Sequence, residues 1–281
     1  MNTHEQRVAF GAAMLAAFIG ILALDFYFDS DLGLGCLGII AGSLALLEFY
    51  DISCKKGYAP FKVSGLLCGI LVFLSCWWEA RTQGRFSLSP TLILLILSWL
   101  FLQQGLTRGV EGAMRDLSIT LFGVFYIFFL LSFAMSLRHL PGGKGLPAVL
   151  AVLLMAKGSD IGAYLFGRKL GKHKLSPIIS PNKTVEGALF GLLFSVLIAI
   201  GWSLYPQVGL LPLGWAVTFG LFIGLTSIGG DLLESIIKRD AGVKDSGSLI
   251  PGFGGLLDVV DCTLTSLPAG YYFLTFYQWK G

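Results

Sequence analysis

Residues 187–205 read GALFGLLFSVLIAIGWSLY, a run of 19 residues without a charged side chain. About 20 consecutive apolar residues are enough for a helix to cross the hydrocarbon core of a bilayer. Because no water is available there, the backbone must form its hydrogen bonds within the segment, as it does in a helix. A membrane barrel would show short strands of alternating polarity instead. This stretch therefore predicts a membrane-spanning helix.

Similar apolar segments recur along the rest of the chain. Of its 281 residues, 55% are hydrophobic and only 13% are charged, whereas a soluble domain carries about 25% charged residues. We predict an all-α, polytopic transmembrane bundle of about nine spans, the first of them an uncleaved span. The predicted segments are 8–24, 32–49, 63–78, 90–104, 117–137, 146–166, 187–205, 210–230 and 254–277.

The basic residues divide unevenly between the two sides that nine spans would create. The side with the N-terminus and the even-numbered loops carries 14 of the 20 Lys and Arg residues, against five on the other side. Cytoplasmic loops are the ones enriched in Lys and Arg. We therefore expect an integral protein of the inner (cytoplasmic) membrane, with its N-terminus and its long C-terminal loops in the cytosol.

Two other classes of protein find no support in the composition. The five cysteines show no C-x-x-C spacing and no histidine at metal-binding distance, so they predict neither a disulfide framework nor a zinc site. No long basic run is present, so nucleic acid is not an expected partner.

The two parts of the chain differ in where their charges lie. We assign residues 1–150 as N-terminal transmembrane helices, about five mostly plain spans, and 151–281 as a catalytic transmembrane region with cytosolic loops. A charge at the bilayer centre costs about 2.5–3.5 kcal/mol. Asp160, Asp231, Glu234, Asp258 and Asp261 should therefore face one another or a polar cavity.

Two of these acidic groups flank a short glycine-rich loop, residues 241–255. Helical spacing places Asp231, Ser235 and Lys238 on one face, and Asp258 and Asp261 one turn apart on the next span. The loop can bring the two acidic ends together. Carboxylates, hydroxyls and basic groups without soft ligands suit Mg²⁺ and the phosphate oxygens that complete its shell. We therefore predict a Mg²⁺ and polyphosphate site here.

The loop at 167–187 has a comparable composition. It holds a basic run and then ISPNKTVEG at 179–187, in which Ser180, Lys183 and Thr184 precede a predicted helix. A helix N-terminus offers backbone N–H groups to an anion. The alternative is an ordinary basic loop attracted to anionic lipid. We favour an anion-binding loop, because the combination of residues at 179–187 is more specific than an ordinary basic loop requires.

Residues 235–261, SIIKRDAGVKDSGSLIPGFGGLLDVVD, resemble the signature of the phosphatidate cytidylyltransferase (CDP-diacylglycerol synthase) family. The upstream stretches 159–164 and 179–187 are also similar to that family, so the resemblance covers about 157–267, whereas 1–150 match only in hydropathy. Two positions depart from the pattern. Phe253 stands where the family usually has His, and Val259 where it usually has Arg, which removes a donor and a cation from the expected phosphate site.

The resemblance implies the joining of CTP and phosphatidic acid into CDP-diacylglycerol and pyrophosphate, a step of phospholipid biosynthesis. A lipid phosphate is already anionic, so the site must mainly neutralise and position phosphates. On this basis the catalytic residues are Asp231, Lys238, Arg239, Lys244, Asp258 and Asp261; the substrate-binding residues are Ser180, Lys183, Thr184, Ser235, Lys172 and Tyr164; and the metal ligands are Asp231, Asp258, Asp261 and Asp160.

The expected cofactor is Mg²⁺, with room for a second cation such as K⁺, and the expected partners are CTP, phosphatidic acid, the bilayer and a second copy of the chain in a homodimer. Two other functions remain open. A CTP-dependent kinase of a polyprenol-type lipid would need a base for its alcohol substrate. A transporter would use Lys157 and Asp160 as coupling groups; these two residues fit a purely structural pair equally well.

Overall fold

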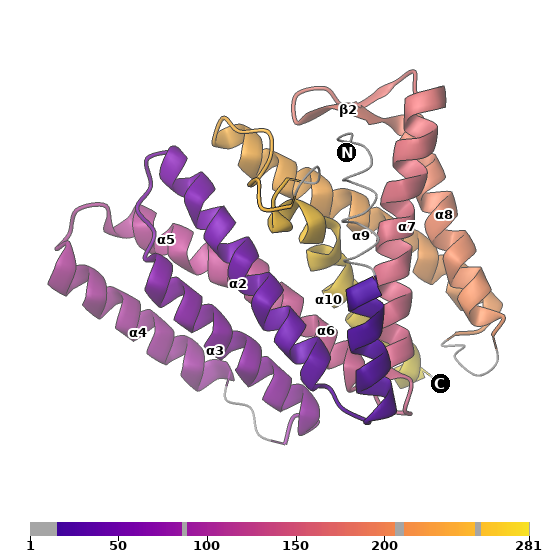
Figure 1. Ribbon diagram of the computed structural model, residues 1–281, viewed down its shortest axis with the longest axis horizontal. Coiled ribbons are helices and arrows are strands. Elements are labelled where there is room, and N and C mark those ends of the chain that lie inside the picture. The colour runs from indigo at the N-terminus through magenta and orange to yellow at the C-terminus, as the bar shows by residue number, and fades with distance from the viewer. Residues whose placement is uncertain (1–15, 86–88, 206–210, 251–253, 281) are drawn as a thin grey trace. The chain divides into compact units, whose positions relative to one another are not determined.

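The computed structural model describes residues 16–85, 89–205, 211–250 and 254–280, and nearly all of these residues are helical (Figure 1). The described chain forms two compact units. Unit 1 takes its residues from Met1–Ser136 and Asp240–Val260, and unit 2 from Leu137–Arg239 and Asp261–Gly281. The prediction that residues 151–281 form the catalytic region and 1–150 do not concerns function rather than packing, so it stays a prediction.

Each predicted apolar segment corresponds to helix in the described residues, which confirms the all-α membrane architecture. Seven helices are long and apolar enough to cross a membrane. The described part of the first helix is Ala16–Tyr27. The others are α2 (Leu32–Lys55), α3 (Lys62–Arg81), α4 (Ser89–Thr107), α5 (Ala113–Gly123), the π-helix η1 (Val124–Phe129), α6 (Leu130–Arg138), α7 (Gly145–Leu170), α8 (Val185–Ser203), α9 (Leu213–Asp240) and α10 (Leu256–Lys280). The predicted span 117–137 comprises most of α5 and all of η1, with α6 ending at Arg138.

The core of unit 1 is aromatic and lies where α2, α3 and η1 meet. The Phe128 ring of η1 is fully buried, and a Cβ atom on either Gly42 of α2 or Gly69 of α3 would overlap it. Tyr50 is also buried, and its hydroxyl donates to the Thr120 carbonyl at 2.8 Å. Glycines thus make room for large rings, and the buried Tyr50 hydroxyl has the hydrogen-bond partner that it requires.

Unit 2 is organised around α7 and α8, which lie side by side (Figure 1). A Cβ on Gly191 of α8 would come within 2.8 Å of the Ser159 carbonyl of α7, so the two backbones approach closely. The rings of Phe166 and Phe190 stack across the same interface at 4.2 Å between centroids. Close glycine packing here holds the two helices that flank the loop at 167–187.

That loop is partly a β-hairpin, which the sequence did not predict. Strand β1 (Lys174–Ser176) pairs antiparallel with β2 (Ser180–Thr184) at the ends of α7 and α8 (Figure 1). The pairing has an irregular register and is only three to five residues long. Strands this short show too little alternation of apolar and polar residues to be predicted, and their polar and charged residues are typical of a loop.

Candidate active site

Four carboxylates gather in unit 2, contributed by α7, α9 and α10. Oxygen atoms of Asp231, Glu234 and Asp261 lie within 4.8 Å of one another. A second group, which shares Asp261 with the first, consists of Asp160, Asp261 and Cys262 at the same separation. Glu234 is fully buried, and Asp261 is 7% exposed. The predicted acidic residues of this unit therefore do face one another.

Three lysines balance this negative charge. The Lys183 ammonium lies 2.5 Å from Asp231 Oδ2, and the Lys238 ammonium lies 2.5 Å from Glu234 Oε2. The Lys157 ammonium is 3.8 Å from Asp160 Oδ2 and donates to Cys262 Sγ at 3.1 Å. Buried charges are tolerated when they are paired in this way. We call Lys157, Asp160, Lys183, Asp231, Glu234, Lys238 and Asp261 the charged cluster.

The helical spacing of α9 explains three of the seven residues of the charged cluster. Ser235 Oγ lies 3.5 Å from Asp231 Oδ1, so these two residues share a face, as predicted. Lys238 lies one turn after Glu234 and forms an ion pair with it. The i, i+4 arrangement with the acid on the N-terminal side is the favourable order on a helix.

Polar groups around Asp160 belong to the same region. Ser227 on α9 is fully buried, and its hydroxyl lies 3.1 Å from the Ala156 carbonyl and 3.3 Å from Asp160 Oδ1. Sequence reasoning missed Ser227 and Cys262 as members of the site, and it gave Glu234 an inward-facing position but no role. Serine and cysteine are common in apolar spans, so only the fold singles them out.

The donor set of the charged cluster fits a hard divalent cation. Carboxylate oxygens from three helices converge, which suits Mg²⁺, an ion that binds one or two protein carboxylates and keeps the rest of its shell for water or phosphate. The single soft ligand, Cys262 Sγ, accepts a hydrogen bond from Lys157. The arrangement can therefore bind a cation beside lysines that attract phosphate.

The hairpin residues predicted to bind substrate have different environments. Thr184 is buried, and its hydroxyl caps α8 by accepting from Gly187 N at 3.1 Å. Val185 N donates to the His173 carbonyl, so two amides at this helix start are engaged within the protein. Lys172 is exposed, and its backbone N–H donates to Glu186. Within this loop, Lys183 makes the contact with the charged cluster, through its ion pair with Asp231.

The remaining predicted residues of unit 2 lie on the hairpin, α7 and α9. Ser180 begins β2 and is half-buried. Arg239, at the end of α9, donates from Nε to the Ile179 carbonyl of the hairpin at 3.2 Å. Tyr164 lies on α7 with 66% of its surface exposed. Its predicted stacking on a base stays a prediction.

In unit 1 the described residues 240–250 and 254–260 comprise the last residue of α9, a connecting stretch and the first turn of α10. Asp258 Oδ2 accepts from Ser246 N at 2.9 Å, Ser246 Oγ at 2.8 Å and Gly255 N at 2.9 Å. Lys244 is exposed and Val259 is half-buried. Phe253 lies outside the described residues. Because Asp231 and Asp258 belong to different units, their predicted sharing of one cation stays a prediction.

One acidic residue of the N-terminal half takes part in this segment. Glu48 of α2 accepts from Leu256 N at 2.9 Å, Leu257 N at 2.8 Å and Ser246 Oγ at 3.2 Å. Glu48 was not singled out from the sequence, because residues 1–150 were predicted to be mostly apolar spans without a role in the site. The available signal was a single acid near the end of the apolar run 32–49.

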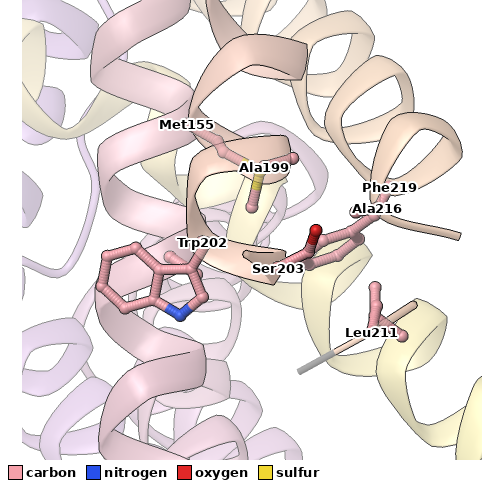
Figure 2. Close-up of a pocket in the computed structure, with 8 residues that line it drawn as sticks. Met155, Ala199, Trp202, Ser203, Leu211, Ala216 and Phe219 are labelled. Carbon is pink, nitrogen blue, oxygen red and sulfur yellow. The ribbon is translucent and has the colours of Figure 1, made fainter. Parts of the chain in front are cut away.

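An apolar pocket in unit 2 is a separate feature (Figure 2). It lies between α7, the C-terminal end of α8 and the start of α9, where Trp202 and Ser203 lie near Ala216 and Phe219 (Figure 2). The residues that line it carry no charge. It therefore lacks the groups that a phosphate or a cation would need, and it is not the candidate active site.

The helices and the charged cluster together describe a polytopic membrane protein that can hold a cation and phosphates beside its spans. The chain belongs to the cytidylyltransferase family, whose sequence profile matches residues 5–277. It is therefore a nucleotidyltransferase and an integral membrane enzyme.

Several relatives agree over most of their length. A phosphatidate cytidylyltransferase of Synechocystis sp. is 35% identical over 260 residues, which cover 82% of this chain and 84% of the relative. The enzyme of that name from Staphylococcus aureus (strain COL) is 36% identical over 83% of this chain and 87% of its own length. The one from Chlamydia pneumoniae is 29% identical over 98% and 93%.

Proposed function

We propose that this enzyme makes CDP-diacylglycerol and pyrophosphate from CTP and phosphatidic acid. The relatives that bear the name phosphatidate cytidylyltransferase support this choice of substrate. The observation that carries it is the charged cluster, in which buried carboxylates and lysines from α7, α9, α10 and the hairpin lie together. Phosphoryl transfer needs this combination more than it needs a base.

In the proposed reaction an oxygen of the lipid phosphate bonds to the α-phosphorus of CTP. The bond from that phosphorus to the oxygen bridging the α- and β-phosphates breaks, and pyrophosphate leaves. Both reactants are anions, so lysines must offset their repulsion. Lys183 and Lys238 are the cations of the charged cluster closest to its carboxylates, and we assign them to the phosphates.

Asp231 and Asp261, supported by Asp160, are the residues we assign to Mg²⁺, with K⁺ as a second cation. Bound Mg²⁺ would neutralise triphosphate charge and stabilise the leaving pyrophosphate. Lys183 now contacts Asp231 Oδ2, so metal and substrate binding would require this lysine to move from the carboxylate to a phosphate oxygen. Asp258, Arg239, Lys244, Ser235 and the hairpin groups keep their predicted roles as further proposals.

The cellular setting belongs to the same proposal. The excess of Lys and Arg on one side favours an N-terminus and active-site loops in the cytosol, in the inner membrane. CTP and Mg²⁺ are then available to the charged cluster. We also propose a homodimer, on the family resemblance alone.

The test is turnover by the purified full-length protein in lipid nanodiscs. CTP, Mg²⁺ and phosphatidic acid should yield equal amounts of pyrophosphate and CDP-lipid. Asp231→Asn should lower turnover by roughly 10²–10³-fold, since it removes a charge from the reacting region. The matched control is Asp51→Asn, which removes a charge from an exposed pair with Lys62 and should leave turnover unchanged.

The products discriminate between functions. CDP together with a phosphorylated alcohol would instead establish a lipid kinase. Mg²⁺-independent movement of a solute without any CTP turnover would establish a transporter. Full activity of Asp231→Asn would show that the charged cluster is structural.

A further inference from the structure

We propose that the last turns of α2 position the signature segment 240–260, with Glu48 holding one end of it and Lys56 the other. The proposal rests on the proposed function, because it makes Glu48 a positioning residue for that reaction. It concerns unit 1 alone, and it brings the N-terminal half of the chain into catalysis.

Glu48 acts as the N-terminal cap of α10. The first N–H groups of any helix lack partners within the helix and need an acceptor. The first two residues of α10, Leu256 and Leu257, donate to Glu48 Oε1 at 2.9 Å and Oε2 at 2.8 Å. The residue before them is Gly255, which has no side chain to serve as a cap. The Glu48 carboxylate, which is far from α10 in the sequence, therefore accepts the hydrogen bonds that an N-cap side chain would otherwise accept. Its negative charge also interacts favourably with the positive end of the helix dipole.

Asp258 completes the cap from within α10. As the third residue of the helix it reaches back to Gly255 N at 2.9 Å, which is the second half of a capping box. Ser246 links the two acids, because its hydroxyl lies 3.2 Å from Glu48 Oε2 and 2.8 Å from Asp258 Oδ2. Holding Glu48 in place therefore also sets where the Asp258 carboxylate lies.

Two glycines of the segment, Gly247 and Gly255, are explained by this close approach. A methyl group on Gly255 would overlap the Ser246 hydroxyl and the Glu48 carboxylate. A Cβ on Gly247 would lie 2.9 Å from Glu48 Oε1. Gly254 has φ +94°, a conformation that other residues rarely adopt. The segment is thus shaped around the Glu48 side chain.

Lys56 holds the other end of the segment. Its ammonium donates to the Asp240 carbonyl at 2.8 Å and to Asp240 Oδ1 at 2.9 Å. Glu48 and Lys56 are eight residues apart on α2 and its C-terminal end, which corresponds to about 12 Å along a helix. Between the two attachments, the described residues 241–250 and 254–255 hold an isolated antiparallel bridge between Ile250 and Gly254. Glu48 on α2 and Lys56 directly after it therefore fix the two ends of the segment.

The experiment compares Glu48→Gln with Asp51→Asn, which removes the same charge one turn away on α2. Hydrogen exchange of the full-length protein in nanodiscs is measured first, without substrate. Glu48→Gln should speed exchange at the amides of Leu256 and Leu257, because these amides donate to different oxygens of Glu48 and glutamine replaces one of the two oxygens with an NH₂ group that only donates. Asp51→Asn should leave both amides as protected as in the wild type.

Turnover is measured next over a range of Mg²⁺ concentrations. Glu48→Gln should raise the half-saturating Mg²⁺ concentration or lower kcat by roughly 10–100-fold, as loss of groups that orient metal ligands does. Glu48→Asp, which keeps the charge but shortens the side chain, should fall between the wild type and Glu48→Gln, and it serves if Glu48→Gln does not fold.

Three outcomes separate the possibilities. Faster exchange with an altered Mg²⁺ dependence supports the positioning role. Faster exchange with unchanged Mg²⁺ dependence and kcat would overturn it and leave Glu48 a structural cap. An inactive wild-type protein with faster exchange in Glu48→Gln would refute the proposed function and the catalytic role together, but it would leave the cap itself established.

Discussion

The stretch 231–260, which contains most of the signature 235–261, divides into two parts that are stabilised by different means. Residues 231–239 lie in unit 2, where buried side-chain charges pair with one another, as Glu234 does with Lys238 at 2.5 Å. Residues 240–260 lie in unit 1, where carboxylates accept from backbone amides instead, as Glu48 does from Leu256 and Leu257.

The difference follows from local structure. In a continuous helix such as α9 the backbone groups are already bonded to one another, so a buried charge must find another side chain. In an irregular loop and at a helix start the amides lack partners, so a carboxylate is most useful there as an acceptor. A signature that reads as one motif therefore contains two structurally distinct parts.

The largest effect on stability should come from breaking the buried pair in unit 2. Glu234→Gln or Lys238→Met alone should lower the free energy of unfolding by about 3–5 kcal/mol, because each leaves a buried charge without its main partner. The double variant should recover much of this loss. Thermal unfolding in detergent measures it, with Asp51→Asn as the exposed control. Additive losses in the double variant would show that the two side chains are not energetically coupled.

A smaller effect is expected from crowding the Glu48 cap. Gly255→Ala should destabilise unit 1 by about 1–3 kcal/mol, because the added methyl group must displace Glu48 or Ser246. Gly201→Ala in α8 is the control, since a Cβ there meets open space and should be neutral or slightly stabilising. The measurement is chemical unfolding, with exchange at Leu256 and Leu257 as the local readout. Equal behaviour of the two variants would mean that the cap tolerates displacement.

The smallest effect should come from Lys56→Gln at the exposed end of the segment. The hydrogen bond with Asp240 raises the pKa of Lys56 above its ordinary 10.5, so the pair is intact at neutral pH and is lost only when pH rises through that higher value. Exposed ion pairs contribute little, so turnover should change within about threefold. High salt should reduce the difference from wild type. A loss as large as that of Glu48→Gln would show that both ends matter equally.

Much of the fold could be predicted because apolar length is a local property. Each of the nine predicted segments is represented in the described helices. The five cysteines are all free, as their spacing predicted. The hairpin at 174–184 was missed because short strands leave no periodic pattern, and its pairing depends on the two helices that flank it.

The site was predicted in part. Asp160, Asp231 and Asp261 do lie in the acidic groups of unit 2, because spacing within α7, α9 and α10 and the high energy of lone charges in lipid both point there. Glu234 and Lys238 were seen in the sequence, but their pairing with each other was not. The capping of α8 by the Thr184 hydroxyl was not predicted, and the assignment of Thr184 to substrate stays a prediction.

The sequence by itself determined the class of protein, the positions of its apolar helices and the residue types of the site, since each of these follows from composition and from spacing along one helix. Only the tertiary structure decided which charges meet and which amides they satisfy. Glu48 and Leu256 are 208 residues apart, and a hydrogen bond of that range has no counterpart in local pattern. It arises because the start of α10 needs acceptors and α2 brings one within reach.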